Sequence, residues 1–211
     1  MIELGVLFMV GFSTGLSGAM IPGPLFLYTV SEAFRHGQIA GLKVTAGHLL
    51  IETGFAALVI IGLREWLVSS AFRTGVAWIG GVSLVLMGLL ILSRVRHLSL
   101  ARNADVSFRW GTLAGGAFFS IASPGFLLWW ATIGAAVFLE GALRGAAGIA
   151  MVAAGHAVAD LSWNWLVALS VERGRDYCTD RVYRLIVTAM AACLIVLGVG
   201  LPVKALVGPS P

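Results

Sequence analysis

Long apolar stretches alternate with short polar joints along the whole chain of 211 residues. A helix that crosses the hydrocarbon core of a bilayer needs about 20 apolar residues, and six stretches are long enough. Their predicted bounds are 4–34, 41–63, 75–93, 111–138, 145–170 and 185–207. Joints such as EAFRHGQ (32–38) and LREWLVSSAFR (63–73) are too short to form a soluble domain. The pattern therefore predicts an all-α, polytopic protein with six transmembrane helices in a single membrane domain, 1–211.

The composition agrees with this pattern. Hydrophobic residues make up 59% of the chain and charged residues 11%, with a mean hydropathy of +0.95, whereas a soluble domain is about 25% charged. The lipid bilayer is therefore the expected surroundings. The chain starts Met1-Ile2-Glu3 and has no Lys or Arg before Arg35. Since a signal peptide needs a basic start, we expect the first segment to stay as a helix.

Basic residues favour one set of joints. The joints after spans one, three and five hold ten of the fourteen Lys and Arg residues, and the other joints hold four. Cytoplasmic loops carry such an excess, so we predict an inner (cytoplasmic) membrane protein with both termini outside the cytoplasm and a basic cytoplasmic loop at 94–110. The net charge of +4 is explained by this asymmetry, and no nucleic-acid partner is expected.

A set of four features occurs twice in the same order. The first copy reads Gly11-xxx-Gly15, Pro22-Gly23, then Gly47-His48-xxx-Glu52, and the second reads Gly111-xxx-Gly115, Pro124-Gly125, then Gly155-His156-xxx-Asp160. Chance similarity between apolar helices is the alternative. Each copy, 1–93 and 111–211, contains three spans, and because three is odd the copies are predicted to be inverted repeats.

Helix breakers lie inside spans one and four. These are Pro22-Gly23-Pro24 and Ser123-Pro124-Gly125, and a proline inside a helix costs roughly 3 kcal/mol or more. We predict that helices one and four are broken there and that the freed backbone groups face a polar cavity, as in transporters built from inverted repeats. A plain proline kink is the alternative.

Two pairs of ionisable residues lie within apolar spans. His48 and Glu52 are four residues apart, about 6 Å along one helix face, and His156 and Asp160 repeat the arrangement. A carboxyl group at mid-membrane costs at least ~2.5 kcal/mol and usually carries function. Three interpretations stay open: a buried pair that only fixes packing, a site for protons or a cationic substrate group, or a divalent-metal site of all four residues.

The remaining motifs are less specific. Asn164 and Ser162 could extend a polar lining, and Trp129 and Trp130 could wall a site or fill the core. The GxxxG pairs permit either packing within the chain or a homodimer. Cys178 and Cys193 suggest no disulfide. No cofactor motif and no nucleophile–base spacing other than the His–acid pairs is visible, so an enzyme is not expected.

With these residues assembled, the chain resembles the LysE-type amino-acid exporter family. The resemblance is carried by GFSTGLSGAMIPGP (11–24), WIGGVSLVLMGLLIL (78–92), SIASPGFLLWW (120–130), Asp160 and MAACLIVLGVGL (190–201). It implies a carrier with about six spans that exports amino acids, coupled to the proton gradient, without an ATP site.

The family motifs transfer to this chain with two departures. The first proline motif maps to Pro22, Gly23 and Pro24, and the Asn-Pro pair of the fourth span maps to Ser123 and Pro124, with serine in place of asparagine. Many members have a lysine after that proline, where this chain has Gly125. If that lysine helps to hold a substrate carboxylate, this chain holds it differently or carries another substrate.

These observations predict a secondary-active exporter of amino acids or related small metabolites. The expected substrate and proton pathway consists of Pro22, Gly23, Pro24, His48, Glu52, Ser123, Pro124, His156, Asp160 and Asn164. Divalent-metal export through His48, Glu52, His156 and Asp160 is the alternative function, and a scaffold that moves nothing is the third.

Overall fold

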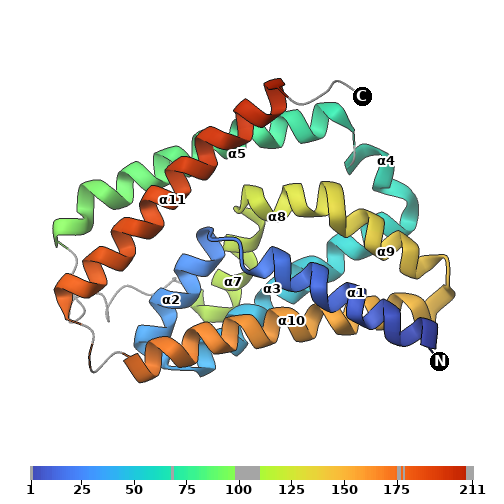
Figure 1. Cartoon of the computed structure of the whole chain (residues 1–211), viewed down its shortest axis with the longest axis horizontal. Coiled ribbons are helices and arrows are strands. Elements are labelled where there is room, and N and C mark those ends of the chain that lie inside the picture. Colours follow the sequence, from blue (N-terminus) through green and yellow to red (C-terminus); the bar gives the residue numbers. More distant parts are fainter. Residues whose placement is uncertain (1, 68, 98–109, 175–176, 178, 208–211) are drawn as a thin grey trace.

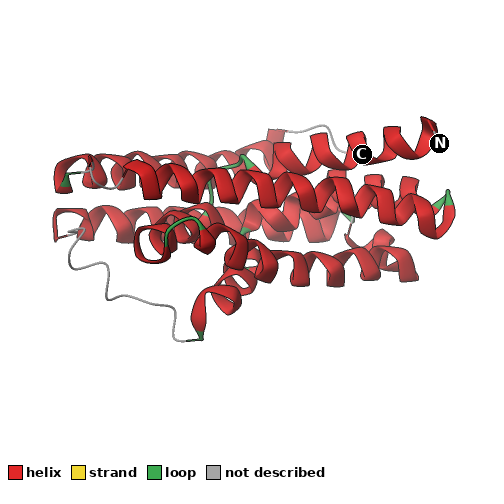
Figure 2. Ribbon diagram, turned by 90° about the horizontal axis from the view of Figure 1, so that it is seen from below, coloured by secondary structure: helices red, strands yellow, loops and turns green. Residues whose placement is uncertain are grey.

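The long helices of this protein lie side by side in a bundle (Figures 1 and 2), and short helices such as α2 run across it. The computed structural model describes residues 2–67, 69–97, 110–174, 177 and 179–207. Regular structure is helical, with no strand in these ranges. Of the described helices, five are long and apolar enough to cross a bilayer, or six if the bent pair α1 and α2 is one span. The prediction of an all-α, polytopic membrane protein is confirmed.

The helices follow one another with short connections. In chain order they are α1 (Ile2–Ala19), α2 (Pro24–His36), α3 (Ile39–Leu58), α4 (Arg64–Leu67), α5 (Ser70–Arg94), α7 (Gly111–Ile121), α8 (Pro124–Trp129), α9 (Ala135–Ala142), α10 (Gly145–Gly174) and α11 (Asp180–Val207). Two π-helical segments, Val59–Leu63 and Trp130–Gly134, follow α3 and α8, and a 3₁₀ turn, Val95–His97, follows α5. The sequence did not predict the π-helical segments.

Spans one and four are broken where the prolines predict. The chain bends by 79° between α1 and α2, and α7 ends at Ile121 before α8 begins at Pro124. Pro24 and Pro124 both stand in the first turn of the new helix, where the missing N–H is no loss. Pro24 and Pro124 thus occupy the same position in their helices, whereas Pro22 lies before α2.

Several predicted joints are helical. The joint at 32–38 was expected to be polar and loop-like, but α2 continues to His36. The joint at 63–73 contains α4 and the start of α5, because the Ser69 hydroxyl accepts a hydrogen bond from the Phe72 amide and caps α5 early. Most of the predicted loop at 94–110, residues 98–109, lies outside the described residues, as does Cys178, whereas Cys193 is a free thiol.

Glycines bring two pairs of helices into close contact, α1 with α10 and α3 with α7. A methyl group at Gly11 would strike the Val152 carbonyl, and one at Gly116 would strike the Val44 carbonyl. Gly11 therefore packs within the chain, and Gly116 makes the same kind of contact. Gly111, which the predicted repeat aligns with Gly11, has nothing within 4 Å of an added carbon.

The glycines beside the two histidines also pack closely against a helix from a distant part of the chain. A methyl group at Gly47 of α3 would strike the Leu113 carbonyl of α7, and one at Gly155 of α10 would strike the Phe8 carbonyl of α1. The remaining long helices, α5 and α11, pack on each other. Gly47 and Gly155 therefore make the same kind of close contact.

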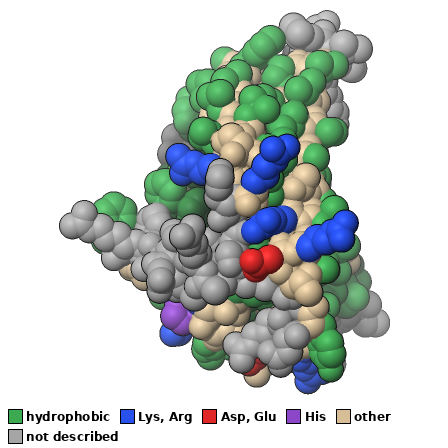
Figure 3. Space-filling view, turned by 90° about the vertical axis from the view of Figure 1, so that its left-hand side faces the viewer, with side chains coloured by type: hydrophobic (Ala, Val, Ile, Leu, Met, Phe, Trp, Pro, Cys, Tyr) green, Lys and Arg blue, Asp and Glu red, His purple; other side chains and the backbone are tan. Residues whose placement is uncertain are grey.

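The ends of the bundle differ in charge. The start of α1 and the end of α11 lie at one end of the bundle (Figure 1). Lys and Arg side chains gather at the opposite end (Figure 3), where α2, α5 and α10 end and α11 begins. The basic residues of the odd-numbered joints that the structure describes are thus collected at one end.

A glycine substitution tests the close helix contacts. We expect Gly47→Ala to lower the free energy of unfolding by about 1–3 kcal/mol, because the methyl group overpacks the α3–α7 contact. Gly54→Ala, on the same helix with nothing within 4 Å of the added carbon, should be neutral or stabilising by up to about 1 kcal/mol. Thermal unfolding of the purified protein in detergent measures both, and equal effects would contradict the packing described.

Candidate functional site

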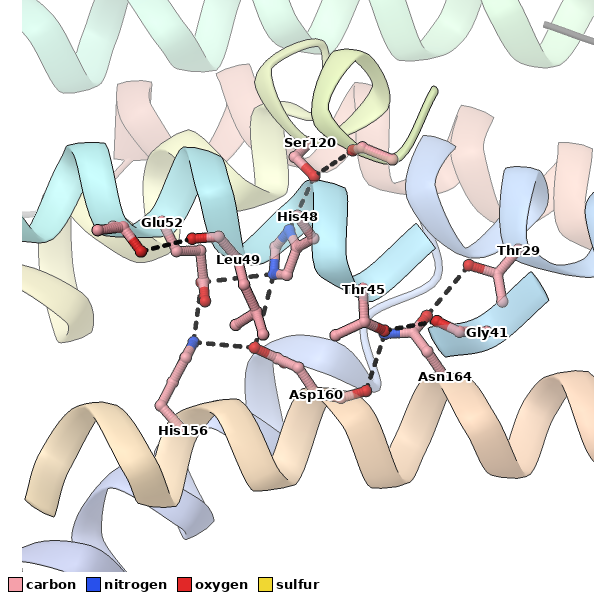
Figure 4. A network of polar contacts seen from close by, with 12 residues as sticks. Thr29, Gly41, Thr45, His48, Leu49, Glu52, Ser120, His156, Asp160 and Asn164 are labelled. Carbon is pink, nitrogen blue, oxygen red and sulfur yellow. Dashed lines mark hydrogen bonds and ion pairs between the residues drawn. The ribbon is translucent and has the colours of Figure 1, made fainter. Parts of the chain in front are cut away.

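Two histidines and two carboxylates meet in the interior, between α3 and α10 (Figure 4). His156 Nε2 lies 2.8 Å from Glu52 Oε1 and 3.2 Å from Asp160 Oδ2. His48 Nε2 lies 3.4 Å from the same Glu52 oxygen and 3.6 Å from the same Asp160 oxygen. We call these four residues the His–acid centre. Each is at most 7% exposed, so both predicted pairs face protein, and each helix contributes one histidine and one acid.

The hydrogen bond of His48 to α7 fixes which of its nitrogens carries a proton. The Ser120 hydroxyl donates to the Gly116 carbonyl over 2.6 Å, which uses its single hydrogen. It must therefore accept the hydrogen bond from His48 Nδ1, which lies 2.8 Å away. In a neutral ring His48 Nε2 then presents a lone pair to two carboxylate oxygens. Because the two carboxylates repel each other and this lone pair, the centre requires a proton on a ring or on a carboxyl group, or another cation such as an ammonium group or a metal ion.

The centre has unused hydrogen-bonding capacity. Glu52 Oε2 and His156 Nδ1 are buried and have no hydrogen-bond partner among the described residues. A metal ion could be held by His48, Glu52 and Asp160, which offer ligand atoms within 4.8 Å of one another. An uncompensated buried carboxylate is costly, so both observations favour a binding role over a purely structural one.

Aromatic side chains of α8 wall the centre. The Trp129 ring lies 4.8 Å from the His156 ring, and Phe126 contacts the His48 ring edge-on at 5.5 Å. Trp130 is fully buried and packs against Phe138. Of the two predicted alternatives for this tryptophan pair, Trp129 walls the centre and Trp130 fills the core.

A polar chain extends the centre towards α2. Asn164 of α10 donates to the Asp160 carbonyl over 3.0 Å and accepts from the Thr29 hydroxyl over 3.1 Å. Asn164 therefore links Thr29 to the backbone of Asp160 in the interior, whereas Ser162 is exposed. Thr29 and Ser120 were not singled out in the sequence, because a hydroxyl four residues from a carbonyl on its own helix is common in apolar helices.

The predicted break residues lie next to one another. The closest atom to an added carbon at Gly23 is Ser123 Oγ, at 3.6 Å, so the breaks of spans one and four meet. Ser123 caps α8 by accepting from the Phe126 amide over 3.5 Å, while Gly23 leaves the start of α2 without a side-chain cap. Pro22 is half-buried, and Pro24 and Pro124 are buried. The second break adjoins the His–acid centre through Phe126 and Trp129.

Glu32, which lies in a predicted polar joint, is a buried acid. Glu32 is 2% exposed, accepts from the Thr112 hydroxyl over 2.7 Å and pairs with Arg35 over 3.2 Å. It ties the end of α2 to the start of α7. The signal in the sequence was its spacing of three from Thr29, which places both on one face of α2.

A double-mutant cycle measures the coupling in the centre. Removing one member of a buried ion pair costs about 3–5 kcal/mol, so we expect His156→Gln and Glu52→Gln each to destabilise the protein, and the double variant to lose less than the sum by at least about 1 kcal/mol. The exposed pair Glu140–Arg144 serves as control, with a coupling below about 1 kcal/mol. Equilibrium unfolding gives both couplings, and additive effects in the centre would contradict the contact.

Comparison with known proteins gives one result. No curated protein and no solved structure is significantly similar to the chain. The model of the LysE type translocator family matches residues 16–204, which include both helix breaks and the whole His–acid centre. The chain therefore belongs to the LysE type translocator family.

Proposed function

We propose that this protein is a secondary-active exporter of amino acids or related small metabolites, coupled to inward proton movement. Members of the family are transporters and not enzymes, and the helices are those of a multi-pass membrane protein. The observation that supports the proposal is the His–acid centre, a buried site that needs a cation and adjoins two broken helices.

The proposal includes an inverted repeat of two three-helix halves, 1–93 and 111–211. It is supported by the packing between the halves. Helix α1 of the first half packs on α10 of the second, and α7 of the second half packs on α3 of the first. Each half supplies one His–acid pair to the centre. Rocking of one half against the other would then expose the same centre to one side of the membrane at a time.

We further propose that the basic end of the bundle (Figure 3) faces the cytoplasm of an inner membrane and that both termini face outside. The substrate's ammonium group or a proton would compensate Glu52 and Asp160. The substrate's carboxylate would be held by the free amides at the start of α2, where the uncapped helix end carries partial positive charge.

Transport in proteoliposomes tests the proposal. We expect labelled amino acid to leave loaded vesicles faster when the external pH is lower, because protons then enter as substrate leaves. Glu52→Gln and Asp160→Asn should each slow this efflux at least about tenfold, since each removes one of the two charges that require the cation. The exposed Glu140→Gln variant should behave like the wild type. Wild-type rates in both centre variants would refute a role for the centre in coupling.

A divalent metal ion is a second candidate substrate, favoured by the distances in the centre. Each histidine Nε2 lies 2.8–3.6 Å from one oxygen of Glu52 and one oxygen of Asp160. His48, Glu52 and Asp160 offer ligand atoms within 4.8 Å of one another, and nitrogen and carboxylate oxygen are ligands that zinc accepts. The hydrogen bond to Ser120 also orients the His48 ring through Nδ1, the nitrogen that faces away from the acids, as is usual for metal-bound histidine.

Cobalt(II) distinguishes this candidate. If the centre holds a metal, purified protein should bind one Co²⁺ with the strong visible absorption of a tetrahedral site, and Asp160→Asn should weaken binding at least about tenfold. His36→Gln, at a half-exposed histidine near Glu32, is the control. Vesicles that move Co²⁺ but no amino acid would support metal export, and no absorption change would exclude the metal site.

A further inference from the structure

An apolar groove of about 540 Å³ lies between α2, α10 and α11. Its lining includes Phe26, Val30 and Phe34 of α2, Trp163 and Ser170 of α10, and Met190 of α11. It runs from the basic end of the bundle, where α2 and α10 end, towards the middle. Its volume is that of a small-molecule site.

The two halves of the protein differ at this point. α5 packs on α8, where a side chain on Gly80 would strike the Pro124 ring. In the proposed repeat, the pair that corresponds to α5 and α8 is α11 and α2, and these two helices are separated by the groove, although the Phe34 and Tyr183 rings lie 5.0 Å apart. The helix that follows the second break, α8, is thus covered by a helix of the other half, whereas α2, which follows the first break, is separated from its counterpart helix by the groove. In an inverted repeat, such a difference is what distinguishes the two access states.

The lining selects the chemistry of an occupant. It is aliphatic and aromatic except for Ser170, whose hydroxyl donates to the Leu166 carbonyl of its own helix. Its other polar groups are the Tyr177 hydroxyl and the Trp163 indole N–H, and no charged side chain lines it. Most of its wall can therefore only bury the surface of an apolar side chain. Fully burying a leucine- or phenylalanine-sized group is worth roughly ten- to a hundredfold in binding.

The groove also adjoins the polar chain. Val30 and Trp163 of its wall are the sequence neighbours of Thr29 and Asn164, which hydrogen-bond to each other. Asn164 in turn reaches the backbone of Asp160. A molecule in the groove therefore has apolar surface around it and a route of hydrogen-bonding groups towards the His–acid centre.

We propose that the groove is the substrate site of the state open to the basic end, and that it receives the apolar side chain of the exported amino acid. The inference rests on the proposed function and narrows it to amino acids with bulky apolar side chains, such as leucine and phenylalanine. The amino group of the substrate points towards Asn164 and Asp160. Movement of α2 onto α11 then closes the groove.

Substitutions at two exposed serines test this inference. Ser170 lines the groove, and Ser83 is an exposed serine of α5 that does not line it. In equilibrium binding to the purified protein, the wild type should prefer phenylalanine to serine at least about tenfold. Ser170→Trp should weaken phenylalanine binding at least tenfold by filling the groove, and Ser83→Trp should not. Unchanged phenylalanine binding in Ser170→Trp would overturn the inference and leave lipid as the occupant.

Thiol labelling provides a second measurement. In a background with Cys178→Ser and Cys193→Ser, a Ser170→Cys variant should react with a water-soluble thiol reagent, and phenylalanine should slow this reaction at least about fivefold. A Ser83→Cys variant should show no protection. Protection by serine but not phenylalanine would contradict the apolar assignment. If vesicles move no amino acid of any kind, the proposed function itself fails, whereas transport of polar amino acids that ignores Ser170→Trp refutes only this inference.

Discussion

The contact between His156 and Glu52, 2.8 Å long and buried between α10 and α3, is the constraint on which the rest of the structure depends. It brings two acids and two histidines from distant parts of the chain into one enclosed space. Two carboxylates in that space repel each other and the lone pair of His48, so a cation must be present. This buried group, in a protein of a translocator family, is the observation that supports the proposed transport site best.

The other features hold this centre in place. Glycines at Gly47 and Gly155 let α3 and α10 approach α7 and α1 so closely that the histidine beside each glycine faces inward. The breaks at Gly23 and Ser123 meet beside the centre, and α8 supplies the aromatic wall on the histidines. A groove separates α2 from α11, whereas α5 and α8 are in contact. The packing on the two sides of the centre therefore differs.

Much of this arrangement could be predicted from local chemistry. A proline beside a glycine disfavours a continuous helix, so the breaks at Pro24 and Pro124 could be predicted, whereas the single Pro202 lies inside α11. A histidine four residues before an acid in an apolar helix is rare enough to mark the centre. The similar contacts of Gly11 and Gly116 could not be predicted, because Gly, Ala and Leu fit several alignments of the two segments. Glu32 and Thr29 were missed since their partners, Thr112 and Asn164, lie far away in the sequence. The groove depends on the separation of packed helices, which no local pattern encodes.

The movement of protons with substrate tests the central claim most directly. Proteoliposomes filled with a pH-sensitive dye can report the pH inside while phenylalanine is added outside, without any imposed gradient. The account predicts that the inside becomes more alkaline as amino acid enters and protons leave through the His–acid centre. It also predicts that a variant carrying both Glu52→Gln and Asp160→Asn gives no such change. Amino-acid uptake by the wild type without a pH change, or an equal pH change in the double variant, would contradict it.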